Sequence, residues 1–142
     1  MADKRVRRPA QYELLMNKIA TNKEGKQVFS SLKDCLVFAA ALGFKNGKRE
    51  SFSNSSEQIQ LQIFSGEHDI IFINSLAIQE TGDTSMLNDS KLDEKILIFE
   101  EYACGGLSIL ENKLALDPEK EIVTMIYSEI SERSLVDDIT NM

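Results

Sequence analysis

The chain of 142 residues contains no tryptophan, two prolines, two cysteines and one histidine. Without tryptophan, a core has to be built chiefly from Leu, Ile, Val, Ala and the seven Phe side chains. Two cysteines are too few for the disulfide framework of a small secreted domain, and no Cys-x-x-Cys pair is present. Cys35 and Cys104 lie in apolar runs, which predicts two buried, reduced thiols. A single histidine leaves no metal-ligand cluster in the sequence, so we expect no metal and no other cofactor.

Long hydrophobic runs are also missing. The longest, residues 35–44, has about ten residues, whereas a membrane-spanning helix needs about 20. The N-terminus is basic but no apolar stretch follows it, so the pattern of a secretory signal is absent. We therefore expect a cytoplasmic protein that makes no membrane contact. The length and the hydrophobic fraction of 42% predict one domain with a real core.

The charges that are present are divided unevenly along the chain. Residues 1–50 hold 11 Lys/Arg and 5 Asp/Glu, a formal +6, and residues 51–142 hold 5 and 18, a formal −13, which together give the overall −7. Such a split concerns partners more than fold. The basic half suits a nucleic acid or an acidic protein, and the acidic half suits a basic partner.

Apolar side chains recur every three or four residues in most of the chain, which is the helical period. The predicted helices cover residues 9–21, 32–42, 68–81, 92–114 and about 117–133. Ser31 or Ser30 is a candidate N-cap for the second helix. Gly43 is its candidate stop, with an extension to Phe44 as the alternative, and Gly82 is expected to end the third helix. The pair Gly105-Gly106 costs the fourth helix about 1–2 kcal/mol in helix propensity, which indicates close backbone packing or a kink.

One segment has the period of a strand instead. Polar and apolar residues alternate over 58–63, and no partner strand is evident. The segment either pairs with a symmetry-related copy, which would make a homo-oligomer, or lies extended over helices. The predicted fold is therefore all-α, a compact bundle of about five helices with at most one short strand. Its parts are a basic flexible arm (1–8), a single helical domain (9–133) and an acidic flexible tail (134–142).

Two basic clusters are the candidate nucleic-acid contacts. Their members are Arg5, Arg7 and Arg8 before the first helix, and Lys45, Lys48 and Arg49 after the second. Each arginine or lysine that neutralises a phosphate contributes weak, salt-dependent affinity. The alternative is that the first cluster is a solvated start of the chain and the second complements the dipole of a helix C-terminus.

No residue is assigned a catalytic role. His68 and Asp69 are adjacent, and adjacent residues on a helix do not face one another. The same holds for Glu100 and Glu101, which we expect to splay apart on a surface. No phosphate-binding glycine loop is present. We therefore expect no enzyme activity; a hydrolase or nuclease would need a nucleophile or metal cluster that the sequence does not offer.

Three segments, taken in order, are familiar together: Phe38–Phe44 with the basic turn after it, Ala77–Asp83, and Ile98–Leu107. The chain from about residue 9 to about residue 115 resembles a family of small bacterial proteins associated with DNA phosphorothioation (Dnd) and related anti-phage defence gene clusters. The resemblance implies work in the bacterial cytoplasm beside larger proteins that modify, sense or cut DNA. It brings no catalytic residue with it.

These observations predict a non-enzymatic accessory or adaptor subunit of such a defence system. It would bind a larger defence protein through its acidic half and an apolar surface, and DNA weakly if at all. The acidic candidates for partner binding are Glu119, Glu121, Glu129 and Glu132. The alternative is a small DNA-binding module or regulator that uses the two basic clusters.

Overall fold

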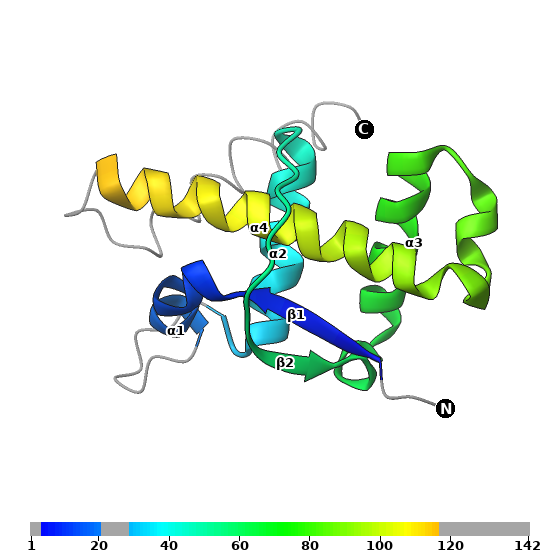
Figure 1. The fold of residues 1–142 in the computed structure, drawn as a ribbon, viewed down its shortest axis with the longest axis horizontal. Coiled ribbons are helices and arrows are strands. Elements are labelled where there is room, and N and C mark those ends of the chain that lie inside the picture. Colours follow the sequence, from blue (N-terminus) through cyan, green and yellow to red (C-terminus); the bar gives the residue numbers. More distant parts are fainter. Residues whose placement is uncertain (1–3, 21–28, 117–142) are drawn as a thin grey trace, which may run out of the picture.

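The computed structural model describes residues 4–20 and 29–116, which form a mainly helical domain with one small sheet (Figure 1). The α-helices are α1 (Glu13–Ala20), α2 (Leu32–Lys45), α3 (Glu67–Thr81) and α4 (Leu92–Leu116). The strands are β1 (Arg5–Pro9) and β2 (Ser55–Gln60). Four short 3-10 helices connect them: η1 (Ala10–Tyr12), η2 (Leu61–Phe64), η3 (Thr84–Leu87) and η4 (Asp89–Lys91). The expected dominance of helix is confirmed, with four α-helices in the described ranges; the predicted helix from 117 lies outside them.

The helix α4 runs along the length of the molecule, and α2 crosses behind it (Figure 1). Glycines make this crossing close. A Cβ added to Gly106 would overlap the backbone of Ala39, and one added to Gly105 would overlap the backbone of Lys48. Gly43 on α2 likewise faces the carbonyl of Tyr102. Close backbone packing, one of the two readings of the glycine pair, is thus the observed one.

The helix ends follow their capping residues with one exception. The Ser31 side chain accepts a hydrogen bond from the Asp34 amide (3.2 Å), as predicted for the N-cap of α2. Gly82 ends α3 with a φ of 69°, a conformation that glycine adopts without strain. The predicted stop at Gly43 is wrong, because α2 continues to Lys45 and Gly43 serves the contact with α4 instead.

Residues 5–8, predicted as part of a flexible arm, form β1 and pair with β2 in antiparallel register. The strand expected near 58–63 is therefore present, earlier by a few residues, and its partner belongs to the same chain. Its last part turns instead into η2, which buries Phe64 against Phe99 (ring centroids 5.5 Å apart). The ladder is irregular between Val6 and Arg8, where Arg7 turns toward α4.

The core lies around α4, between α2, α3, α1 and the sheet. Cys35 and Cys104 are both buried in it and unbonded, as predicted. Within the described residues, every helix falls short of the length and apolarity needed to cross a lipid bilayer.

Candidate functional site

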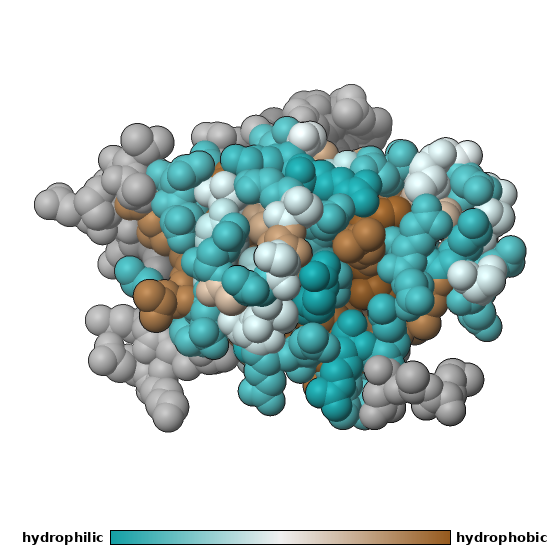
Figure 2. All heavy atoms as spheres, in the orientation of Figure 1, coloured by the Kyte–Doolittle hydropathy of each residue, from teal (hydrophilic) through white to brown (hydrophobic). Residues whose placement is uncertain are grey.

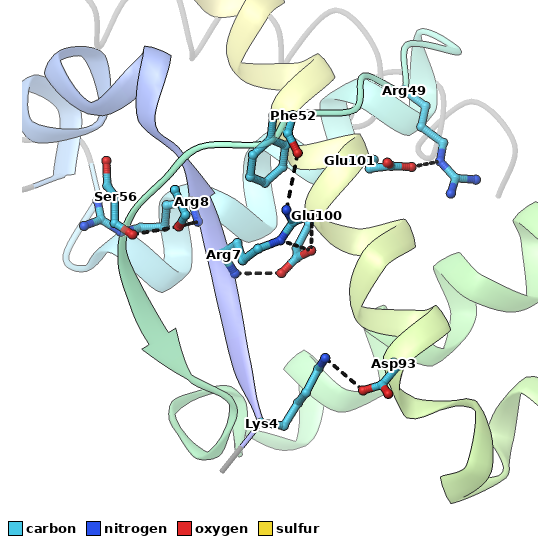
Figure 3. A network of polar contacts seen from close by, with 10 residues as sticks. Lys4, Arg7, Arg8, Arg49, Phe52, Ser56, Asp93, Glu100 and Glu101 are labelled. Atoms are coloured by element: carbon cyan, nitrogen blue, oxygen red, sulfur yellow. Dashed lines mark hydrogen bonds and ion pairs between the residues drawn. The ribbon is translucent and has the colours of Figure 1, made fainter. Parts of the chain in front are cut away.

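Ion pairs join the basic and acidic halves of the sequence to one another (Figure 3). Four cations from residues 4–50 bind carboxylates from residues 51–116. The pairs are Lys4–Asp93 (2.8 Å), Arg7–Glu100 (3.0 Å), Lys33–Asp69 (2.9 Å), and Arg49 with both Glu80 (2.6 Å) and Glu101 (2.7 Å). The uneven distribution of charge, which we interpreted in terms of partners, therefore also provides ion pairs within the domain.

Arg7 and Glu100 form the most buried of these pairs. The Arg7 backbone amide donates to Glu100 Oε2 (2.7 Å) and its Nε donates to Oε1 (3.0 Å). The guanidinium also lies over the Phe52 ring, 4.5 Å from its centroid. The Arg7 amide thus finds its acceptor on α4, at the position where the β1–β2 ladder is irregular. Glu100 is 4% exposed, so the predicted surface position is wrong for this residue.

Arg49 lies on the other side of α4 and joins three segments of the chain. Its Nε donates to Glu101 and its Nη1 to Glu80, while the Tyr102 hydroxyl donates to Glu80 Oε1 (2.7 Å). The Tyr102 hydrogen bond, followed by the Arg49 contact, holds the pKa of Glu80 below its usual value. Burial and the Glu80 carboxylate raise the pKa of Tyr102 to about 12. Glu100 and Glu101 do splay apart as predicted, toward Arg7 and Arg49 respectively.

The six candidate DNA contacts are thus in different situations. Arg8 is 4% exposed, and its Nε donates to the Glu57 carbonyl (2.6 Å), so its guanidinium is directed into the protein. Arg7 and Arg49 are engaged by carboxylates. Arg5 is exposed and makes no ion pair with a described residue. Lys45 and Lys48 flank the Gly47 turn, with Lys48 3.8 Å from Glu50. The four acidic candidates, Glu119, Glu121, Glu129 and Glu132, lie outside the described residues.

Neither the two thiols nor any grouping of metal-ligating side chains in the described residues forms a reactive site. Burial raises the pKa of Cys35 to about 12 and that of Cys104 to about 11, so both thiols stay protonated at neutral pH. No three His, Cys, Asp or Glu side chains of residues 4–20 and 29–116 are grouped so that they could hold a metal ion.

An apolar groove opens between α3, η2, η3 and the first turns of α4. It has a volume of about 580 Å³, and its apolar lining residues are Leu61, Phe64, Ile70, Ile73, Leu87, Leu92 and Ile96. Ile70 is 50% exposed and Leu87 is 55% exposed, so the apolar lining continues onto the surface. Figure 2 shows brown, apolar atoms among teal side chains on the side where Figure 1 draws α3 and the start of α4. We call this the α3–α4 groove.

Only a weak signal in the sequence indicates this groove. The third predicted helix carries four consecutive apolar residues, Ile70, Ile71, Phe72 and Ile73. Consecutive residues of a helix point in different directions, so they cannot all face one core. That excess was a detectable sign of an uncovered face. The inward position of Lys95, which also lines the groove, had no sequence signal.

The chain matches the family model described as DNA sulphur modification system-associated protein 4 over residues 5–140. No curated protein and no solved structure matches it. The predicted resemblance to a Dnd-associated family is thereby confirmed. Because the match covers nearly the whole sequence, the chain belongs to the family of DNA sulphur modification system-associated protein 4.

Proposed function

We propose that this protein is a non-enzymatic accessory subunit that binds a larger protein of a DNA sulphur modification system in the bacterial cytoplasm. The observation that carries the proposal is the α3–α4 groove. Apolar side chains left half exposed around a concave surface are typical of a protein-binding site. The family description supports a role in association with such a system. A part in anti-phage defence belongs to the same proposal.

The described carboxylates favour this function over catalysis. Glu80, Glu100 and Glu101 are each held by an arginine, and Asp69 by Lys33, so they serve the fold. The thiols are buried, with raised pKa values. These charged groups are engaged in contacts within the domain, whereas Ile70 and Leu87 of the groove are half exposed among the described residues.

Co-expression of the tagged full-length chain with the DNA sulphur modification proteins of the same genome tests the proposal. We expect one larger protein to co-purify in stoichiometric amount after nuclease treatment. The double variant Ile70→Ser/Leu87→Ser should reduce the recovered partner at least about tenfold, because hot-spot residues of an interface contribute about 2 kcal/mol or more.

Leu14→Ser is the matched control, since Leu14 is 86% exposed on α1, at the other end of the molecule from α3 (Figure 1). It should leave recovery unchanged, and all variants should keep the thermal midpoint of the wild type within a few degrees. Equal recovery with the groove variant and the wild type would contradict a role for the groove. Absence of any partner would contradict the adaptor function itself.

A second candidate function, weak DNA binding, rests on the turn after α2. Gly47 adopts a φ of 63° there, and Lys45 is exposed at the end of α2. The variant Lys45→Ala/Lys48→Ala tests it without disturbing Arg49, whose ion pairs join α3 and α4. A DNA-probe shift at low salt that this variant abolishes would support DNA binding. An identical shift, or none with the wild type, would exclude these lysines from that role.

A further inference from the structure

Lys95 is a buried cation whose charge no described residue balances. It is 6% exposed on the first turns of α4, and its Nζ donates to Asn74 Oδ1 on α3 (3.0 Å). No carboxylate of residues 4–20 or 29–116 lies within ion-pair distance of it, although Asp89 lines the same groove. By contrast, Lys4, Arg7 and Arg49, which also reach α4, each have a carboxylate within 2.6–3.0 Å.

This arrangement is costly for the isolated protein. An ammonium group has three donors, and Lys95 has one acceptor, a neutral amide oxygen. Removing an ammonium from water without a counter-charge is strongly unfavourable, whereas an apolar side chain of similar size would pack there at no such cost. A lysine that lowers the stability of its own domain and lies at a groove wall is best explained by a binding partner that pairs with its ammonium group.

The groove indicates what would balance the charge. Apolar side chains surround Lys95 and Asn74, and the lining extends onto the surface through Ile70 and Leu87. A small anion would use only the polar centre and leave this apolar rim in water. A peptide segment with apolar side chains on both sides of a carboxylate would use both.

Within the described residues, the chain leads away from the groove after its first turns on α4. The helix α4 begins beside the groove and carries the chain away from it, ending at Leu116 at the opposite end of the molecule (Figure 1). Its 25 residues cover about 38 Å at 1.5 Å per residue. The unbalanced charge of Lys95 and the apolar lining are the features that point to a segment of a partner protein as the occupant.

We infer that the α3–α4 groove binds a segment of a partner protein in which one Asp or Glu, flanked by apolar residues, pairs with Lys95. The inference rests on the proposed adaptor function for the source of the segment. The recognition chemistry itself rests only on Lys95, Asn74 and the apolar lining. Lys95 is then a specificity-determining residue that exchanges stability of the free protein for selection of an acidic partner.

A phage-displayed library of random 16-residue peptides, selected on the full-length chain, supplies a defined probe. We expect enriched peptides to share an Asp or Glu between apolar residues. A synthetic enriched peptide should bind at least about tenfold more weakly to Lys95→Met, since the variant leaves the carboxylate of the peptide buried without its partner. The Asp→Asn or Glu→Gln peptide should lose as much affinity for the wild type and should bind both proteins alike.

Lys95→Met should meanwhile melt at the same temperature as the wild type or higher. This combination of lost binding and retained stability distinguishes recognition from a structural role. Three results would overturn the inference: enriched peptides without a carboxylate, equal affinity of Lys95→Met and wild type for the acidic peptide, or a lower melting temperature with equal losses for the acidic and amide peptides.

Two further arms identify the occupant. A synthetic peptide of residues 117–142 that competes with the selected peptide for the groove would overturn the assignment to a different protein. In the co-expression experiment above, a partner retained equally by wild type and Lys95→Met would contradict the inference and leave the adaptor function standing. Selected acidic peptides without any co-purified partner would support the groove chemistry and contradict the adaptor function.

Discussion

The two halves of α4 are packed in opposite ways. From Glu100 onward the helix is pressed against α2 through Gly105 and Gly106, and its carboxylates are held by Arg7 and Arg49. Before Phe99 it borders the α3–α4 groove, where the lining is apolar and Lys95 has only an amide partner. One helix thus carries a region whose buried and half-buried carboxylates are paired with arginines and a region with a buried ammonium that has no described carboxylate partner. We expect the second half to contribute mainly to stability, and the proposed binding to involve the first half.

Gly106→Ala, in the tightly packed second half of α4, should lower the free energy of unfolding more than Glu100→Ala or Tyr102→Phe. The added Cβ would overlap the Ala39 backbone in the α2–α4 crossing, and relieving such overpacking costs about 3 kcal/mol. The gain of about 1 kcal/mol in helix propensity offsets only part of this. Urea denaturation should give a lower free energy of unfolding.

The overlap involves the Ala39 carbonyl group and Cα, so the double variant Ala39→Gly/Gly106→Ala should not recover stability. A Gly106→Ala protein as stable as the wild type would show that the crossing tolerates a wider spacing than this structure has.

Glu100→Ala should have a smaller effect, about 2 kcal/mol, because hydrogen bonds to charged groups contribute about 1.5–3 kcal/mol. The change removes the acceptor of the Arg7 amide and of its guanidinium. Thermal unfolding of Glu100→Ala and of Glu94→Ala, on the same helix, makes a matched pair. Glu94 is exposed and lies 4.0 Å from Lys91, so its loss should change stability by less than about 0.5 kcal/mol. Equal effects of the two changes would argue that the Arg7 pair contributes little.

Tyr102→Phe should cost least, about 1 kcal/mol at neutral pH, through loss of the hydrogen bond to Glu80. The difference should depend on pH. The Tyr102 pKa is raised to about 12 in the folded protein, against about 10 in an unfolded chain, so its contribution is full below about pH 10 and disappears as the pH rises to about 12.

At acid pH the relevant group is Glu80, whose pKa shift has the opposite direction to that of Tyr102. The pKa of Glu80 is lowered in the folded protein, so its contribution is present above the unfolded value of about 4.3 and is lost as the pH falls through the folded value. The stability difference between wild type and Tyr102→Phe should therefore form a plateau between about pH 5 and 10. A difference that stays constant from pH 3 to 12 would contradict the Tyr102–Glu80 contact.

Local signals in the sequence were sufficient for the four α-helices of the described residues. Ser31 and Gly82 mark ends that the structure keeps, and the Gly105-Gly106 pair identified a close contact without naming its partner. The strand β1 was not predictable in this way. Its five residues, Arg5–Pro9, include three arginines, and its pairing depends on β2 about 50 residues later and on Glu100 beyond that. Contacts so far apart leave no periodic pattern.

The charge split was visible, but its physical meaning was not. Opposite charges on two halves of one domain are able to neutralise one another, and which carboxylate meets which arginine depends on the packing of α4. The predicted roles of Glu119, Glu121, Glu129 and Glu132 stay predictions. Lys95 looked like any solvated helix lysine, because its burial follows from the approach of α3.

The pairing of β1 with Glu100 also sets an order of events during synthesis. Arg7 and Glu100 are 93 residues apart, and a ribosome adds about 5–20 residues per second. Arg7 is therefore synthesised about 5–20 s before its carboxylate partner. During that interval β2 is already available to pair with β1, but the Arg7 amide and guanidinium lack the Glu100 acceptor, so this contact is completed only when α4 is made.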